Sequence, residues 1–355
     1  MSVVRLSAAV LAGAGFALSG CIAAAVPVAA AGGIYKVRQD RQDKRERRAK
    51  RDKQVKAPVA GQVIVTPDGK RVTVTGLTQL PAPDGTVAAK TNTGNVPPEM
   101  QYLYGSGEAA ALSYQAYQAL WNYLRVEIGY LRDKSQAKSV VLSPGSTLDN
   151  LKFETCGKRP MAVVLDVDET VLQNLGYEAD AAARGGGYDA GRWSRWEQTG
   201  AEQVLAVPGA AEALAAARRE GFTVIFNSNR SAATAPQTVA ALEHAGLGPA
   251  VLGETLWLRG EGEPSGKDAR RARISQHYCI VAMAGDQLGD FSDLFNAPEL
   301  GVQARRSSAG VSLVAPLWGA GWFMLPNPVY GTGLKGGMDD VFPPAVRWTD
   351  PQEKK

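Results

Sequence analysis

The stretch 163–170 constrains the fold more than any other part of the chain. It begins Val-Val-Leu, a short apolar run with β-branched side chains that is typical of a buried strand, and Asp166 and Asp168 follow at once. Ligand sites in open α/β sheets lie beyond the carboxyl ends of the strands, so this strand would deliver two carboxylates to such a site. Carboxylates this close repel each other unless a cation lies between them. A hard metal ion such as Mg²⁺ is the usual solution.

Apolar runs of strand length alternate with segments of helical periodicity after residue 160. This alternation is typical of a parallel sheet with helical crossovers, so we expect a doubly wound parallel α/β sheet. The expected strands are 161–165, 222–226, 255–258 and 279–284, and the expected crossover helices are 211–219 and 236–244. The segment between 258 and 279, which includes Lys267, has the composition of a polar loop.

A long amphipathic helix is expected at 108–131, before the first strand of the sheet. Its apolar stripe predicts core packing through Leu112, Tyr117, Leu120, Trp121, Leu124 and Ile128. The alternation of strands and helices is also interrupted by a long segment at 174–207. This segment separates the first strand from its crossover helix and contains Trp193 and Trp196. An insertion at this point would lie over the site as a cap.

The N-terminus carries a leader-like sequence. Residues 1–20 contain one cation, Arg5, and an apolar run that ends in Leu-Ser-Gly before Cys21. This pattern resembles a bacterial lipoprotein signal, which implies that the leader is removed and that Cys21 becomes a lipid anchor. Ile22 is not an acidic retention signal, so the outer membrane of the cell envelope is the expected destination. A signal anchor is the alternative, because the apolar run continues to Ile34 and most cations follow it.

Positive charge is concentrated in residues 36–56, which hold eleven Lys or Arg and four acids and so carry +7. The whole chain carries +4, so the remainder carries −3 (4 − 7). A basic nucleic-acid-binding fold is therefore not indicated, and no nucleic-acid polymer is expected as a partner. The run 36–56 is interpreted as a solvated stalk after the lipidated residue, or as a contact for anionic lipid or a cell-envelope polymer.

The chain of 355 residues is long enough for a large domain with a real core. Before that domain, the segment 57–98 is expected to hold a hairpin and a linker, because alternating residues at 62–66 and 71–75 flank an Asp-Gly turn. The main domain is expected at 99–345, followed by a polar tail at 346–355. The chain has two histidines, neither in a recognisable catalytic setting, so a histidine phosphatase or a zinc site is not indicated.

Two later strands of the predicted sheet also end in polar residues. Asn-Ser-Asn-Arg at 227–230 follows the second strand, and Asp286 and Asp290 follow the fourth. Lys267 lies between these two groups in the sequence. Because parallel strands bring their carboxyl ends to one edge of the sheet, all of these side chains are expected to meet there.

In this order the motifs resemble those of the haloacid dehalogenase (HAD) superfamily of phosphohydrolases. More closely, they resemble the class C acid phosphatases, which include surface lipoprotein 5′-nucleotidases. The matching stretches are Asp-x-Asp-Glu-Thr-Val-Leu-x-Asn-x-x-Tyr at 166–177, Ser-Asn-Arg at 228–230, Gly-Asp-x-Leu-x-Asp-Phe at 285–291 and Leu-Pro-Asn-Pro-x-Tyr-Gly at 325–331. The resemblance implies a HAD-like Rossmannoid fold with a small cap and an N-terminal helical segment. It also implies a Mg²⁺-dependent phosphomonoesterase acting on 5′-nucleotides or similar small phosphate esters.

The resemblance assigns roles to the four aspartates. It implies that Asp166 is the nucleophile that forms an aspartyl-phosphate, and that Asp168 is the general acid and then the general base. Asp166, the backbone carbonyl of Asp168 and Asp286 would hold Mg²⁺, and Asp290 would be a further ligand or would support one.

For the phosphate group, the resemblance implies hydrogen bonds from Ser228 and Asn229, and a catalytic charge from Lys267 that also binds phosphate. Two interpretations of Arg230 stay open: it is a functional residue, or it is a surface cation.

Two further features carry expectations on the same resemblance. Trp193 and Tyr330 match aromatic positions that clamp a base or a pyridine ring in nucleotidase members of this family, although both could instead be apolar cap and core residues. Cys156 and Cys279 precede neighbouring strands of this fold, so an exported protein could join them in a disulfide. Two other functions are considered: a catalytically idle envelope-binding lipoprotein, and phosphotransfer to an acceptor alcohol on the same fold.

Overall fold

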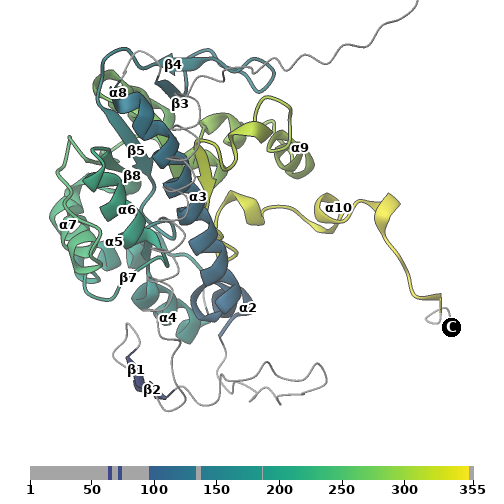
Figure 1. The fold of residues 1–355 in the computed structure, drawn as a ribbon. Coiled ribbons are helices and arrows are strands. Elements are labelled where there is room, and N and C mark those ends of the chain that lie inside the picture. Colours follow the sequence, from purple (N-terminus) through teal and green to yellow (C-terminus); the bar gives the residue numbers. More distant parts are fainter. Residues whose placement is uncertain (1–62, 66–70, 74–95, 133–136, 186, 352–355) are drawn as a thin grey trace, which may run out of the picture. The chain divides into compact units, whose positions relative to one another are not determined.

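The computed structural model describes residues 63–65, 71–73, 96–132, 137–185 and 187–351 (Figure 1). The chain divides into two units, Met1–Ala89 and Lys90–Lys355. In the first, β1 (Val63–Val65) and β2 (Arg71–Thr73) pair in antiparallel register, which confirms the strands of the predicted hairpin. The leader, Cys21, the stalk at 36–56 and most of the linker lie outside the described residues. Among the helices that are described, none combines the length and the apolar character needed to cross a membrane.

A five-stranded parallel sheet forms the centre of the second unit, in the order β11-β10-β5-β8-β9. This confirms the predicted parallel α/β fold and places the 161–165 strand in the middle of the sheet. The strands are β5 (Met161–Leu165), β8 (Thr223–Ser231), β9 (Leu256–Arg259), β10 (Cys279–Gly285) and β11 (Trp322–Met324).

Both faces of this sheet are covered, as the alternation of β5 shows. Val163 and Leu165 belong to one apolar cluster, and Ala162 and Val164 belong to another. Because successive side chains of a strand point to opposite faces, the two clusters are the two faces of the sheet. Helices α3 (Gly107–Arg132), α6 (Ala210–Arg219) and α7 (Ala235–His244) contribute to the first cluster, and α8 (Asp268–His277) contributes to the second.

Helix α3 confirms the predicted amphipathic helix, and most of its apolar stripe packs as expected. Tyr117, Leu120 and Leu124 are buried, but Leu112 is 43% exposed, so its assignment to the core was wrong. The buried positions of α3 are Ala109, Ser113, Tyr117, Leu120 and Leu124, and Leu112 lies beside this row. Tyr117 also fixes the loop after β5, because its hydroxyl donates to the carbonyl oxygen of Thr170 at 2.6 Å.

The segment expected to be a polar loop after residue 258 instead contains helix α8. It was not predicted because it has no apolar stripe: its buried residues are Arg270, Arg271, Ile274 and Ser275. Also unpredicted are the edge strand β11 and an antiparallel pair formed by β3 (Lys138–Leu142) and β4 (Phe153–Thr155). Three further short α-helices in the described residues are α2 (Pro98–Met100), α9 (Val302–Ser308) and α10 (Met338–Val341).

The excursion between β5 and α6 forms two helices, α4 (Leu175–Arg184) and α5 (Ala190–Thr199). Strands β6 (Leu172–Gln173) and β7 (Leu205–Ala206) pair in antiparallel register at its two ends. The pairing closes the excursion at its base, so it is a small unit inserted between a strand and its crossover helix.

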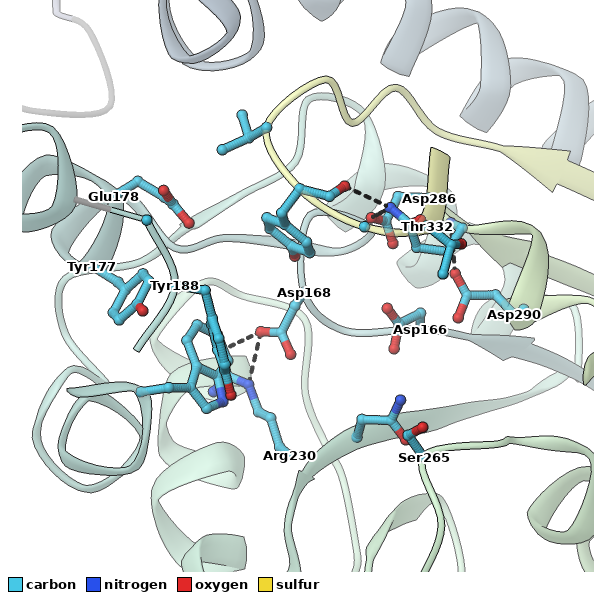
Figure 2. Close-up of a pocket in the computed structure, with 18 of the residues that line it drawn as sticks. Asp166, Asp168, Tyr177, Glu178, Tyr188, Arg230, Ser265, Asp286, Asp290 and Thr332 are labelled. Carbon is cyan, nitrogen blue, oxygen red and sulfur yellow. Dashed lines mark hydrogen bonds and ion pairs between the residues drawn. The ribbon is translucent and has the colours of Figure 1, made fainter. Parts of the chain in front are cut away.

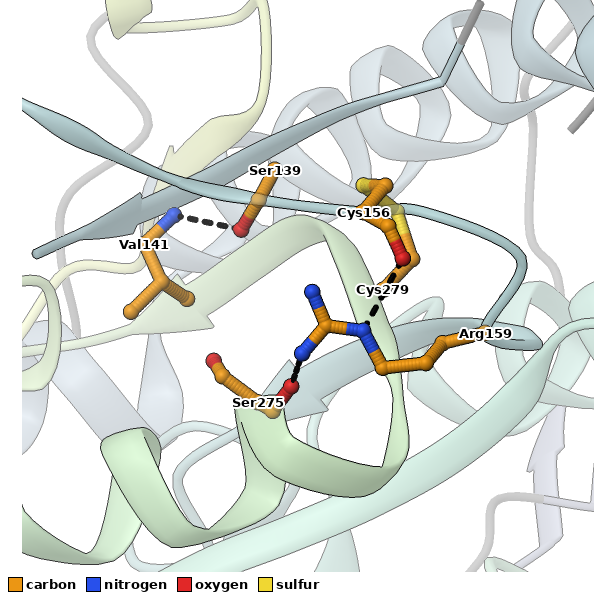
Figure 3. Close-up of a disulfide and its surroundings, with 6 residues drawn as sticks. All are labelled: Ser139, Val141, Cys156, Arg159, Ser275 and Cys279. Carbon is orange, nitrogen blue, oxygen red and sulfur yellow. Dashed lines mark hydrogen bonds between the residues drawn. A yellow bond between two sulfur atoms is a disulfide. The ribbon is translucent and has the colours of Figure 1, made fainter. Parts of the chain in front are cut away.

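A disulfide joins Cys156 to Cys279, with 4.6 Å between their Cα atoms (Figure 3). Cys279 opens β10, and in the parallel register it lies opposite Met161, the first residue of β5. The turn that carries Cys156 is held by Arg159, whose Nε donates to the Cys156 carbonyl oxygen at 2.9 Å. The bond therefore ties the segment before β5 to the neighbouring strand, as the sequence suggested.

We expect this disulfide to contribute about 2–5 kcal/mol to the free energy of unfolding, because it closes a long loop in the unfolded chain. Denaturant unfolding with and without a reductant measures the contribution. The double variant Cys156→Ser/Cys279→Ser is the matched control, since its stability should not respond to the reductant. Two free thiols in the mass spectrum of the non-reduced protein would contradict the bond.

Candidate active site

Three carboxylates converge at the carboxyl ends of β5, the central strand of the sheet, and of its neighbour β10. Asp166 directly follows β5, Asp286 directly follows β10, and Asp290 lies in the turn after it. Parallel pairing places Leu165 opposite Ala284, and the Asp166 amide donates to the Ala284 carbonyl oxygen at 3.0 Å. One oxygen from each of the three carboxylates lies within 4.8 Å of the others. The structure thus brings together three of the four aspartates predicted from the sequence.

The turn after β10 depends on Gly285. A Cβ atom at this position would collide with the side chain of Asp290, so only glycine lets the turn fold back over the strand end. The Asp290 carboxylate then accepts from the backbone amide of Gln287 at 2.8 Å. The close approach at Gly285 and this hydrogen bond together hold Asp290 beside Asp286.

Lys267 lies among the three acids, although it comes from a different part of the chain. Its ammonium group forms an ion pair with Asp290 at 2.7 Å and a second, short contact with Asp166. Lys267 is 5% exposed. Burial alone would lower the pKa of Lys267, but Asp166 and Asp290 outweigh that effect and raise it, so the side chain stays charged.

The single positive charge of Lys267 does not neutralise three carboxylates. Burial raises the pKa of Asp166 well above its usual range; Lys267 opposes the shift, but Asp290 and Asp286 add to it. Burial, with Asp290 next, raises the pKa of Asp286 to about 7, although Asn327 and Gln287 donate to its carboxylate. An all-oxygen site with two uncompensated negative charges fits a hard divalent cation such as Mg²⁺.

Asp168 points away from this cluster toward Arg230 (Figure 2), and Asn174 also holds its carboxylate. Its Oδ1 accepts from Arg230 Nη2 at 2.7 Å and from Asn174 Nδ2 at 2.9 Å. In the described part of the chain no hydrogen bond reaches its Oδ2. Arg230 is 3% exposed, so its interpretation as a surface cation is wrong. Asp168 is not among the clustered side-chain oxygens, which leaves the predicted metal contact to its backbone carbonyl.

The end of β8 supplies the predicted phosphate-binding residues. Asn229 lines the cavity described below, and its Oδ1 accepts from the buried Arg270. This leaves the Nδ2 group of Asn229 to donate. Ser228 is fully buried and does not line the cavity, and its Oγ accepts from the Arg230 amide at 3.1 Å. A phosphate contact from Ser228 therefore stays a prediction.

Glu169 is a buried acid of the site to which the sequence assigned no role. Its carboxylate accepts from the hydroxyls of Tyr104 and Tyr330 and from the amide of Asn174. Burial, followed by repulsion from Asp168, raises the pKa of Glu169 to about 7. Its φ of 53° lies in the left-handed region, which costs a non-glycine residue about 1–3 kcal/mol and is typical of active sites. The position of Glu169 next to Asp168 in the sequence indicated that it lies near the site. Its contacts with Tyr104 and Tyr330 could not be predicted, because both tyrosines are distant in the sequence.

A cavity of about 980 Å³ extends from the acids toward the inserted helices. Lys267, Asn229 and Arg230 line it near the acids. Trp193 of α5 and Tyr330 also line it, so the aromatic residues predicted from the sequence face the site and are not buried in the core. Trp193 packs edge-on against Tyr177 at 5.0 Å between ring centroids, and its Nε1 donates to Glu197 at 2.7 Å. The inserted unit therefore contributes part of the cavity wall, as expected of a cap.

Known proteins share both the sequence pattern and the fold of this chain. The family model for HAD superfamily, subfamily IIIB (Acid phosphatase) matches residues 112–333. The structure of the class C acid phosphatase from Bacillus anthracis is 27% identical over 66% of this chain and 84% of that chain, with a TM-score of 0.52. A crystal structure of the class C acid phosphatase from Bacillus anthracis with tungstate bound is 25% identical over 72% of this chain and 91% of that one, with a TM-score of 0.51.

The family match covers more than half of the chain and includes all four aspartates, Lys267 and both aromatic residues of the cavity. The chain therefore belongs to the acid phosphatases of HAD subfamily IIIB and is a phosphomonoester hydrolase of the class C type.

Proposed function

We propose that this chain is a Mg²⁺-dependent phosphomonoesterase that hydrolyses 5′-nucleotides or similar small phosphate esters and is anchored to the bacterial cell envelope. The observation that carries the activity is the group of three carboxylates around Lys267 in the wall of the cavity, with Asp286 and Asp290 buried and Asp166 nearly so. Such a group needs a divalent cation before it can accept a phosphate dianion. In that case Asp166, Asp286 and the backbone of Asp168 would hold Mg²⁺, with Asp290 beside them. When bound, the ion offsets the repulsion between phosphate and carboxylate.

The residues of the chain divide the reaction between two neighbouring aspartates. An oxygen of Asp166 attacks phosphorus, and the bond to the leaving oxygen breaks while Asp168 donates a proton to that oxygen. Asp168 then takes a proton from water, which attacks phosphorus and releases Asp166. Arg230 and Asn174 bind only Oδ1 of Asp168, so they orient the carboxyl group and leave Oδ2 to carry the proton.

The dimensions and lining of the cavity support a nucleotide as substrate. A volume of about 980 Å³ has room for a nucleoside beyond the phosphate, and Trp193, Tyr188 and Tyr330 supply aromatic surface. The class C acid phosphatase from Bacillus anthracis has been solved with tungstate, a tetrahedral oxyanion like phosphate. This supports an oxyanion site among the acids.

Asp166→Asn should lower the release of phosphate from AMP by at least about 1,000-fold, because it removes the attacking carboxylate. A chelator should abolish the activity of the unchanged protein, and added Mg²⁺ should restore it. Asp149→Asn, an exposed acid between β3 and β4, is the matched control and should keep full activity. Equal activity in Asp166→Asn, or activity that survives the chelator, would exclude the proposed chemistry.

Asp168→Asn should separate the two proton transfers. With AMP the rate should fall by about 10²–10⁴-fold, because the nucleoside alkoxide leaves unprotonated. With p-nitrophenyl phosphate the leaving group needs no proton, so the first step should survive while hydrolysis of the aspartyl-phosphate slows. Rapid-mixing measurements should show a burst of about one p-nitrophenol per protein. An equal loss on both substrates without a burst would remove Asp168 from this role.

The lipid anchor is proposed from the Leu-Ser-Gly-Cys sequence that ends at Cys21. Expressed in a bacterium and labelled with an alkyne fatty acid, the protein should carry the label and sediment with the outer membrane. Cys21→Ser should lose the label and retain the leader. An unlabelled protein that still carries residues 1–20 would favour the signal anchor instead.

A further inference from the structure

Glu178 is a buried carboxylate in the wall of the active-site cavity to which the reaction assigns no role. It lies in the first turn of α4, in the inserted unit, and is 6% exposed. Figure 2 shows its carboxylate directed toward the interior of the cavity, which it lines together with Tyr177, Tyr188 and Trp193.

In the described part of the chain no hydrogen bond reaches the side chain of Glu178, unlike the other buried glutamates near the cavity. Glu169 accepts from two tyrosine hydroxyls and an amide. Glu197 accepts from the Trp193 indole and the Thr234 hydroxyl. Burial raises the pKa of Glu178 to about 7, and Arg192 opposes only part of that shift. A carboxylate without donors at this depth is costly to keep.

Arg192 is the cation that acts on Glu178 electrostatically, but its hydrogen bonds go elsewhere. Its Nη2 donates to the Gly187 carbonyl oxygen at 2.6 Å and to the Tyr177 hydroxyl at 3.4 Å, and its Nε lies 3.8 Å from Asp180. Arg192 therefore does not satisfy the acceptor oxygens of Glu178. Because Glu178 faces the cavity, a ligand bound there can supply the hydrogen-bond donors that its carboxylate lacks.

We propose that Glu178 is a specificity-determining residue that accepts hydrogen bonds from hydroxyl or amino groups of the leaving group. The enzyme would then favour phosphate esters of donor-rich alcohols, such as nucleosides, over esters without donors. This inference rests on the proposed function, because it places the leaving group in the part of the cavity lined by the inserted helices. A role limited to stabilising the start of α4 is the structural alternative.

The test compares kcat/KM for AMP and for p-nitrophenyl phosphate, whose leaving group has no donor, in the full chain with Mg²⁺. Glu178→Met, which removes the acceptor at similar volume, should lower kcat/KM for AMP about 10- to 100-fold and leave the nitrophenyl ester unchanged. Glu178→Gln keeps a neutral acceptor and should lose less. Glu202→Gln removes an exposed charge from the same inserted unit, away from Arg192, and should change neither substrate.

Two analogues of AMP identify the source of the donor. If the sugar hydroxyls bind Glu178, 2′,3′-dideoxy-AMP should be insensitive to Glu178→Met. If the base amino group binds it, the monophosphate of purine riboside should be insensitive. A loss that persists on both analogues, an equal loss on the nitrophenyl ester, or no loss on AMP would overturn the proposal.

Equilibrium dialysis with radiolabelled adenosine separates this inference from the proposed function. If the unchanged protein lacked phosphatase activity, the proposed function would fall, but adenosine binding would still test Glu178. Weaker binding by Glu178→Met than by Glu202→Gln supports the proposal. Equal binding by the two variants, or no binding by the unchanged protein, overturns it.

Discussion

Electrostatic repulsion among Asp166, Asp286 and Asp290 is the constraint on which the rest of the site depends. Burial makes the repulsion stronger, because the surrounding dielectric is low and water cannot screen the charges. Lys267 offsets one of the three charges, through contacts with Asp166 and Asp290. The remaining imbalance cannot relax by rotation of the side chains alone, since neighbouring strands and hydrogen bonds hold them. The fold therefore maintains a site that is unfavourable by itself and that a bound cation would make favourable.

The supporting contacts come from segments that are far apart in the sequence. Asp286 accepts from Thr170 at 3.0 Å and from Asn327 at 2.7 Å, so the loop after β5 and the loop after β11 both fix it. Gln287 donates to Asp286 and to the Tyr330 carbonyl oxygen, and Gly331 leaves the space that its side chain occupies. Through these contacts the segment that carries Asn327 and Tyr330 helps to hold the carboxylate of Asp286 in place.

The strand ends were predictable because their chemistry follows from local pattern. The strand 161–165 was correct as β5, and 279–284 was correct to within one residue as β10, so the meeting of their acids followed from parallel pairing. Helix α8 was not predictable, since a helix whose buried face includes two arginines has no apolar periodicity. The guanidinium of Arg270 donates to Asn227 and Asn229, which lie on strand β8, about forty residues earlier in the sequence. Partners of this kind exist only in the folded chain.

Two neighbouring buried glutamates show why burial and hydrogen bonding must be considered together. Glu169 and Glu178 have the same side chain, and burial raises the pKa of each to about 7. Yet Glu169 has protein donors on its carboxylate and fixes Tyr330, whereas Glu178 faces the cavity without them. A satisfied buried acid organises the protein around itself, and an unsatisfied one at a cavity wall leaves its hydrogen-bonding capacity to whatever enters. The difference therefore assigns Glu169 to the framework of the site and Glu178 to the recognition of the leaving group.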